Sequence, residues 1–202
     1  MKKISLTLAL AFGTLMSVAQ NNNTIVPPDP IQQSNFSIGV TGGYGHSFLV
    51  PYRNYAFNSS WNAGIAAVYS PWVHWGVGID ALYSSEGSTF TSGDLRYKTT
   101  LGYVRVPLKA VYYFNKYEND FRPKVSLGPT LGFLVNEDNT SDASSFDLGA
   151  NLSAGFNYRL LRAVWLSAEA SYYQGFLDVY KENTVTDLNG NIRANIGLHF
   201  GF

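Results

Sequence analysis

Apolar and polar residues alternate with a period of two along most of the chain after residue 35. In residues 145–159 the alternation is unbroken: Phe146, Leu148 and Ala150 begin one face, and polar residues or glycines fill the other. This period is typical of β-strands, in which successive side chains point to opposite faces. The pattern predicts eight strands, at about 35–48, 59–71, 73–86, 95–114, 121–136, 145–159, 163–177 and 190–202.

Alternation alone leaves two all-β arrangements open. A soluble barrel or sandwich buries the apolar face and exposes the polar one. A transmembrane barrel does the reverse, and each apolar face here is long enough to cross a hydrocarbon layer, which takes a tilted strand of about 9–11 residues.

The lengths of the connections favour the membrane arrangement. Outer-membrane barrels have short turns on the periplasmic side and longer loops outside. Every second connection of this chain obeys that rule. The short ones lie near 71–73, 115–120 and 160–162, and the longer ones near 49–58, 87–94, 137–144 and 178–189.

Aromatic residues gather at the ends of strands next to the short turns. Aromatic rings favour the headgroup level of a bilayer and form girdles around transmembrane barrels. The sequence therefore predicts an aromatic girdle at this end, made of Trp72, Trp75, Phe114, Tyr158 and Trp165.

The polar faces consist mainly of Gly, Ser, Asn and Thr, which suits a narrow interior. We therefore expect a closed eight-stranded antiparallel up-and-down transmembrane β-barrel with short periplasmic turns and longer extracellular loops. Charges inside such a barrel are costly unless they are paired. The same parity predicts a structural network of ion pairs that fills the lumen, rather than a diffusion pore, from Asp80, Arg105, Lys109, Glu169 and Arg193.

The first residues predict export. A basic start, an apolar run and small residues before position 20 are typical of a cleaved signal peptide, here residues 1–19. Residues 20–34, rich in Asn, Gln and Pro, are expected to form a flexible leader before a barrel domain at 35–202. Export and a membrane barrel together predict the bacterial outer membrane, with both mature termini in the periplasm.

Composition and motifs narrow the function classes. Lys and Arg number 14 and Asp and Glu number 14, so the chain carries no net charge that would attract nucleic acid. There is no Cys, and the sequence has no motif that joins a histidine to a nucleophile and an orienting acid. We expect no enzyme activity, no cofactor and no metal, although a lipid-modifying enzyme stays open as the least favoured alternative.

Several stretches resemble one family. They are "GVGIDALYSSEGS" at 76–88, "YVRVPLKAVYYF" at 103–114, "VSLGPTLGFLV" at 125–135, "FDLGANLSAGFNYRL" at 146–160 and "LSAEASYYQGFLDV" at 166–179. These stretches and the aromatic C-terminus are similar to the PorT-like outer-membrane β-barrel family of Bacteroidetes-type bacteria. The resemblance implies an outer-membrane location and an eight-stranded barrel. It also implies a C-terminal signal for the barrel-assembly machinery, formed by Ile196, Leu198, Phe200 and Phe202.

The expected role is structural, or an interaction through the extracellular loops. A founding member of the PorT-like family is implicated in protein secretion, so support of secretion is the alternative. The expected partners are outer-membrane lipid, lipopolysaccharide, the assembly machinery and an unidentified protein. Two interpretations stay open for Arg96 and Lys98, at the loop end of their strand: contact with lipopolysaccharide phosphates, or ordinary solvated charges at the base of a loop.

Overall fold

Antiparallel strands make up most of the chain that the structure describes. This computed structural model describes residues 35–50, 55–92, 95–138, 143–180 and 186–201, so the expected signal peptide, the leader and Phe202 lie outside it. No helix with the length and apolar character needed to cross a membrane occurs within these ranges. The strands are β1 (Phe36–Val50), β2 (Tyr55–Ala56), β3 (Asn58–Tyr69), β4 (Trp75–Ser92), β5 (Leu95–Tyr113), β6 (Phe121–Asp138), β7 (Phe146–Leu161), β8 (Val164–Asp178) and β9 (Leu188–Gly201).

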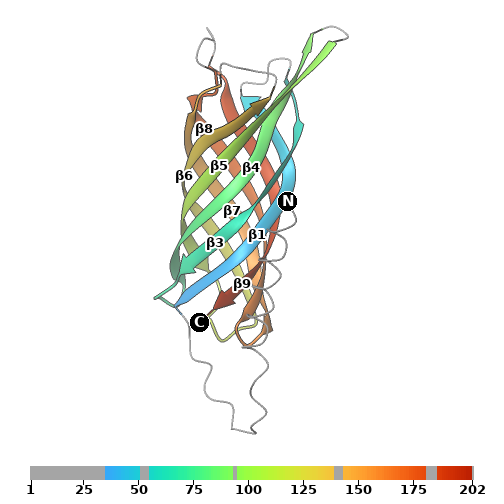
Figure 1. Cartoon of the computed structure of the whole chain (residues 1–202). Coiled ribbons are helices and arrows are strands. Elements are labelled where there is room, and N and C mark those ends of the chain that lie inside the picture. The colour runs from blue at the N-terminus through green and yellow to red at the C-terminus, as the bar shows by residue number, and fades with distance from the viewer. Residues whose placement is uncertain (1–34, 51–54, 93–94, 139–142, 181–185, 202) are drawn as a thin grey trace, which may run out of the picture. The chain divides into compact units, whose positions relative to one another are not determined.

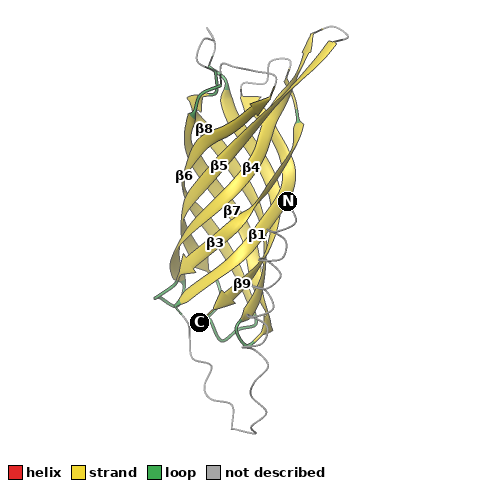
Figure 2. Ribbon diagram, in the orientation of Figure 1, coloured by secondary structure: helices red, strands yellow, loops and turns green. Residues whose placement is uncertain are grey.

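The eight long strands close into a barrel. Each long strand pairs with its neighbours in chain order, and β1 pairs with β9 to complete the ring. The two-residue β2 adds only a short pairing with the upper part of β4. Figures 1 and 2 show the tilted strands joined by loops at the two ends. The predicted closed eight-stranded antiparallel barrel is confirmed.

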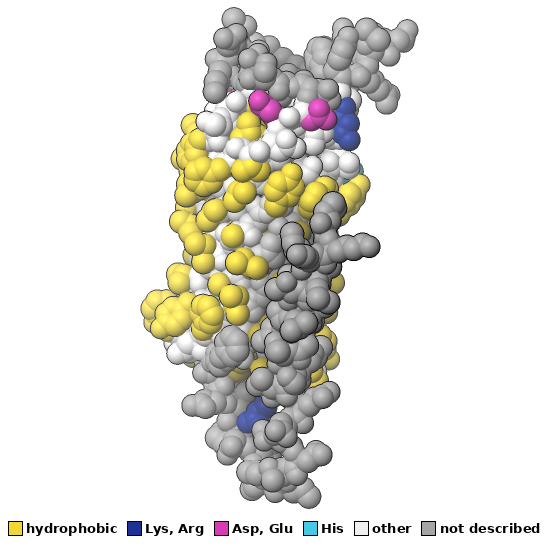
Figure 3. All heavy atoms as spheres, in the orientation of Figure 1, with side chains coloured by type: hydrophobic (Ala, Val, Ile, Leu, Met, Phe, Trp, Pro, Cys, Tyr) yellow, Lys and Arg dark blue, Asp and Glu magenta, His cyan; other side chains and the backbone are white. Residues whose placement is uncertain are grey.

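Closure of the barrel gives each long strand a hydrogen-bonded neighbour on both sides. The alternation of residues along each strand then places one set of side chains inside the barrel and the other set outside. In β3 the burial pattern alternates strictly over most of the strand, with Asn58, Ser60 and Asn62 buried inside. Ile65 on the same strand points outward and is 54% exposed. Figure 3 shows hydrophobic side chains spread over the visible wall. The inside of the barrel is therefore polar and its outside apolar, which is the inverse of a soluble protein.

The upper end of β4 differs from the prediction, whereas β5 begins where it was predicted. Residues 87–94 were expected to form a loop, but β4 continues to Ser92 and pairs with β5 from Leu95 onward. The hairpin extends beyond the ends of the other strands (Figure 1). The short β2, which lies in the expected loop 49–58, was also missed, because two residues are too few to show a period.

Gly87 lies in β4 between Ser85, the last residue that pairs with β3, and Thr89, the first that pairs with β2. Its φ of 147° belongs to the region that favours glycine, and a Cβ atom there would overlap the carbonyl oxygen of Thr99. The Gly87 N–H donates to Oγ of Ser47 at 2.9 Å, and this hydroxyl donates to the Gly87 carbonyl at 2.7 Å. This part of β4 is thus attached to β1 by two hydrogen bonds.

The "short-turn end" is the end of the barrel with the connections 70–74, 114–120 and 162–163. "Long-loop end" means the opposite end, which carries the β4–β5 hairpin.

Candidate functional site

The barrel lumen holds the densest group of buried charged residues. Arg105, in β5, lies at its centre and is 2% exposed. Its Nε donates to Oε1 of Glu86 at 3.1 Å and its Nη2 to Oε2 at 2.6 Å, a bidentate pair. Its Nη1 donates to Oδ2 of Asp147 at 2.7 Å and to the hydroxyl of Tyr173 at 2.9 Å. The guanidinium therefore joins two carboxylates that come from different strands.

Glu86 also accepts hydrogen bonds from residues other than Arg105. Its Oε1 accepts from Oγ of Ser84 at 2.7 Å, and its Oε2 accepts from Nδ2 of Asn189 at 2.8 Å. Nη2 of Arg193 lies 3.5 Å from Oε1, and Nη1 of Arg193 donates to Oγ of Ser84 at 2.5 Å. Burial of this carboxylate, which is 0% exposed, is thus matched by donors on every side.

Glycine makes the contact between Arg105 and Asp147 possible. The two residues stand on β5 and β7, with β6 between them, and Gly132 of β6 lies opposite both in the strand register. A Cβ atom at 132 would overlap the Arg105 guanidinium. Because Gly132 has no side chain, Arg105 reaches across a whole strand.

The same arrangement, in which a glycine lies between polar side chains of the two flanking strands, occurs at two more positions. Gly155 lies opposite both Lys124 and Glu169, whose Nζ and Oε2 are 3.1 Å apart. Gly43 lies opposite both Asn62 and Asn195, and Nδ2 of Asn62 donates to Oδ1 of Asn195 at 3.0 Å. A narrow lumen brings strands two apart close enough for such contacts.

A second group of charges lies nearer the short-turn end. Nζ of Lys109 donates to Oδ2 of Asp80 at 2.6 Å, and Nζ of Lys124 donates to Oγ of Ser167 at 2.9 Å in addition to its pairing with Glu169. His199 is 7% exposed and lines the same part of the lumen. The acids Asp80, Glu86, Asp147 and Glu169 thus match the bases Arg105, Lys109, Lys124 and Arg193 in number.

The five residues predicted for the lumen network all face the interior, but they do not form one cluster. Arg105 and Arg193 meet at Glu86, whereas Asp80 and Lys109 pair lower in the barrel. Glu169 pairs with Lys124. Which charges meet across the lumen depends on the register of the strands. Alternation does not give the register, so the central role of Glu86 and Asp147 was missed.

Neutral partners of Arg105 were missed as well. Its guanidinium carbon lies 4.3 Å from the ring centre of Tyr103 and 4.4 Å from that of Tyr173. The Tyr173 hydroxyl also donates to Oδ2 of Asp147 at 2.9 Å. The sequence does carry one signal for Tyr173, because it has inward parity and lies close to a glycine. Gly149 leaves room for the Tyr173 ring.

Little free space remains in the lumen. A cavity of about 30 Å³ lies between Arg105 and Lys109, and one of about 20 Å³ lies between Lys109 and His199. Each cavity has room for one or a few water molecules. Asn62, Asp80 and Thr130 line the first cavity, and each has a buried side-chain oxygen that receives no hydrogen bond from a described residue.

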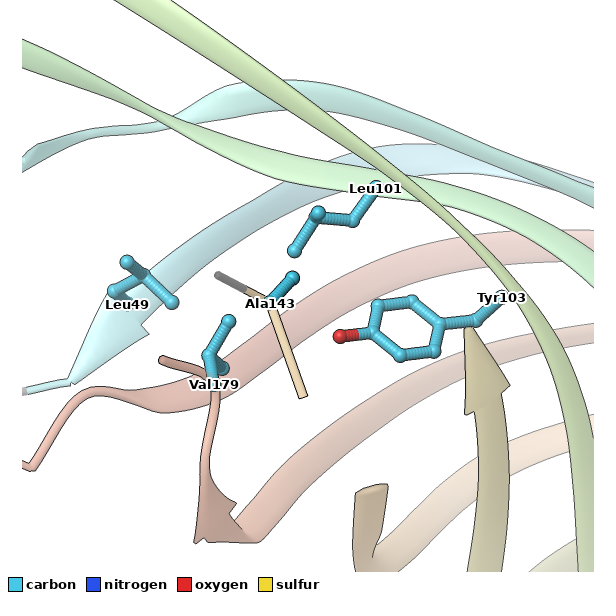
Figure 4. Packing of buried hydrophobic residues seen from close by; sticks show 5 residues of the cluster. All are labelled: Leu49, Leu101, Tyr103, Ala143 and Val179. Atoms are coloured by element: carbon cyan, nitrogen blue, oxygen red, sulfur yellow. The ribbon is translucent and has the colours of Figure 1, made fainter. Parts of the chain in front are cut away.

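A hydrophobic cluster closes the lumen at the long-loop end. It consists of Leu49, Leu101, Tyr103, Ala143 and Val179, all at most 5% exposed. Figure 4 shows these side chains converging from strands on opposite sides of the barrel and from two connections. The top of the polar column is therefore sealed by apolar contacts.

Hydrogen bonds hold the two connections in that cluster. The N–H of Ser144 donates to the Val179 carbonyl at 2.7 Å, and Ala143 bridges Tyr180. The Tyr180 hydroxyl interacts with Ser88 and Thr99 of the β4–β5 hairpin, and burial raises the pKa of this hydroxyl, against the effect of these hydrogen bonds. The loops and the hairpin thus form one connected cap.

Aromatic and arginine side chains close the short-turn end. The guanidinium of Arg122 lies 4.0 Å from the ring centre of Tyr113, and that of Arg159 lies 4.6 Å from the ring of Trp165. Tyr117, from the β5–β6 connection, packs 5.5 Å from Trp165, and its carbonyl accepts a hydrogen bond from Arg159.

Trp165 corrects the predicted girdle. It is 4% exposed and points into the lumen, because it has the same parity in β8 as Ser167 and Glu169. The other four predicted residues face outward, with exposures between 45% and 60%: Trp72, Trp75, Phe114 and Tyr158. Trp165 was assigned by its height alone, without regard to its parity.

The C-terminal residues proposed as an assembly signal alternate as expected where they are described. Ile196 is 61% exposed, and Leu198 and Phe200 are partly exposed on the same face of β9. Phe202 lies outside the described residues, as do the side chain of Arg96 and those of its neighbours in the hairpin. Lys98 is exposed.

The outer wall carries a depression of about 520 Å³, far larger than the cavities in the lumen. Its lining is mostly apolar and includes Ile79, Leu108, Leu127 and Pro129. A surface of this kind suits hydrocarbon rather than water.

The candidate chemistry of the described residues is sparse. No group of three or more His, Cys, Asp or Glu residues among them could hold a metal ion. His74 has a ring nitrogen 2.8 Å from the Tyr113 carbonyl, and His46 contacts the ring of Phe57.

Comparisons with known proteins agree with this architecture. A family model described as "Outer membrane protein beta-barrel domain" matches residues 18–181. No curated protein matches the chain.

Solved structures of similar fold are small outer-membrane barrels. The outer membrane protein OprG of Pseudomonas aeruginosa has a TM-score of 0.58 at 17% identity, with 86% of this chain and 99% of that chain covered. Neisserial surface protein A has a TM-score of 0.57 at 17% identity, with 84% and 98% covered. At such identities the likeness establishes the fold alone.

Arg105→Met should destabilise the barrel strongly. The substitution leaves Glu86 and Asp147 buried without their main cation, and breaking a buried ion pair costs about 3–5 kcal/mol. Urea unfolding of protein reconstituted in vesicles, followed by tryptophan fluorescence, measures the change. Lys116→Met, in the exposed β5–β6 connection, is the matched control and should leave the free energy of unfolding nearly unchanged. Equal midpoints for both variants would contradict the central role of Arg105.

Proposed function

Because the chain belongs to the outer membrane protein β-barrel domain family, we propose that it is a closed outer-membrane barrel with a structural or interaction role. The observation that carries this proposal is the lumen, which is filled by paired charges and closed at both ends. A molecule outside the barrel can then meet only its wall or its ends.

The proposal orients the barrel with its short-turn end toward the periplasm and its long-loop end outside the cell. Short turns on the periplasmic side are the rule for this class of barrel. The apolar wall, with aromatic residues such as Trp72 and Trp75 near one end, would contact membrane lipid. Lys98 near the other end would face lipopolysaccharide phosphates.

The interaction surface in this proposal is the cap at the long-loop end. The β4–β5 hairpin extends farthest from the barrel, and the cap holds the connections after β6 and β8 against it. Phe57 and Phe176, both more than half exposed, lie near this end. A preformed surface of this kind loses less entropy on binding than flexible loops do.

The proposal assigns no catalytic chemistry to the chain. It also leaves the C-terminal strand its expected contact with the barrel-assembly machinery during insertion.

A filled lumen predicts no steady conductance. In planar lipid bilayers, the purified full-length protein should insert without producing the stepwise currents of an open pore. A lumen with cavities of about 20–30 Å³ has no continuous path for hydrated ions. Reproducible open-channel steps that persist after detergent controls would overturn this part of the proposal.

Trimming the connections 137–144 and 178–189 should remove partner binding. Intact cells would be treated with a membrane-impermeant crosslinker, and the adducts of this chain compared between variants. The matched control is the double variant Asp80→Leu, Lys109→Met, since replacing a buried ion pair by apolar residues is often tolerated. The adducts should vanish on trimming and persist in the control, with both variants confirmed as folded by heat-dependent gel mobility. Adducts that survive trimming would contradict the assignment of this surface.

Support of protein secretion is the second proposal, and it rests on the resemblance of the strands to PorT-like proteins. It predicts that deletion of the gene leaves exported cargo stranded in the periplasm. The structural or interaction role predicts normal secretion in the same strain, so analysis of secreted and periplasmic fractions separates the two.

A further inference from the structure

Arg122 differs from the other buried cations of the barrel. It is the second residue of β6, at the short-turn end, and is 5% exposed. Its Nε donates to the Asn115 carbonyl over a long 3.4 Å. No carboxylate of the described residues forms an ion pair with its guanidinium.

The surroundings of Arg122 are positively charged. Arg122 and Arg159 lie on the ring of Tyr117, with their guanidinium carbons 5.4 and 5.3 Å from its centre. Asp120 pairs with Arg159 at 3.3 Å, but its side chain is 69% exposed. Among the described residues, the one carboxylate paired at this end is thus solvated and belongs to Arg159, not to Arg122.

Aromatic contact compensates only part of the burial of Arg122. A cation gains less free energy from an aromatic face than an unpaired buried ion loses when it leaves water. The rest of the lumen is balanced, with four acids and four bases, and has no carboxylate to spare for this end.

A cavity of about 30 Å³ lies beside this unbalanced charge. Its lining includes Arg122 itself and Ser70, Tyr117, Asn157, Trp165 and His199. Oδ1 of Asn157 is buried and receives no hydrogen bond from a described residue. Rotation of this amide by half a turn would place its NH₂ group there, as a donor to an anion.

We propose that this cavity binds a small inorganic anion, held by Arg122 with the amide of Asn157 and the hydroxyl of Ser70 as neutral donors. The positive charge favours an anion, and the cavity has room for a small one. The anion completes the closure of the short-turn end by neutralising the one guanidinium that the chain itself leaves unpaired within its described part.

Trp165 is a built-in reporter of this cavity. It lines the site and is 4% exposed, whereas Trp61, Trp72 and Trp75 are 47–60% exposed on the outer wall. Replacing those three by Phe leaves a full-length protein whose tryptophan emission comes from the site alone. Iodide is the probe, because it quenches tryptophan on contact, and gluconate, which is too bulky to enter, keeps the ionic strength constant.

Iodide should quench this protein in a saturable way, with half-saturation at or below about 0.15 M, the physiological ionic strength. Chloride should compete and restore the emission. Arg122→Met in the same background should lose the saturable component, and Arg122→Lys should keep part of it. Acrylamide, a neutral quencher, should have little effect on any of them.

Weak linear quenching by iodide that Arg122→Met does not change would overturn the proposal. So would equal quenching by acrylamide, which would mean a water-filled site without charge selection. If Arg122→Met does not fold, competition by chloride in the parent protein decides alone: no recovery of emission means no anion site. None of these outcomes bears on the conductance or crosslinking results.

Discussion

Hydrocarbon offers no hydrogen-bond partner to a peptide group, and this constraint determines the rest of the structure. A strand that crosses a membrane must have neighbours on both sides, so the sheet has to close. Here the closure is the pairing of β1 with β9, which runs from Ser37↔Gly201 to Val50↔Leu188. Once eight strands are joined in a ring, the interior is only wide enough for side chains. The polar interior and the absence of a large cavity in the described lumen both follow.

Charged side chains in this interior are buried, and the chain compensates the cost of their burial by ion pairing. A buried carboxylate such as Glu86 is tolerated because it accepts hydrogen bonds from Arg105, Ser84 and Asn189. Pairs of this kind contribute little net stability compared with apolar packing, but they penalise any arrangement that separates them. We infer that the charges specify register in a barrel whose inward faces are otherwise small and alike.

Glycine has a defined part in this arrangement. Gly132, Gly155 and Gly43 each lie between two polar side chains of the flanking strands. No side chain projects into the lumen at these glycines, so the polar side chains of the two flanking strands interact with each other across the strand between them. Substitution of such a glycine would act on the network and not only on the strand that carries it.

Sequence alone predicts the strands, the closure and the parity of most side chains, because a two-residue period is a local property. It predicts much less about contacts. Glu86 lies opposite Leu101 and Arg105 lies opposite Leu82, so their pairing depends on long side chains that run along the barrel axis. Trp165 was misplaced because its height was considered without its parity. Tyr117 could not be assigned at all, since a residue in a short turn has no period, although it helps to close one end.

The pairing of β1 with β9 also governs how the chain must be made. The hydroxyl of Thr41 donates to the carbonyl of Ile196, 155 residues away. No part of this seam can form before the last strand has been synthesised, and contacts between distant residues are slow to form. Until then both edges of the sheet carry unpaired peptide groups, which are templates for aggregation. A polypeptide of this design therefore has to be kept apart from its own copies between synthesis and insertion.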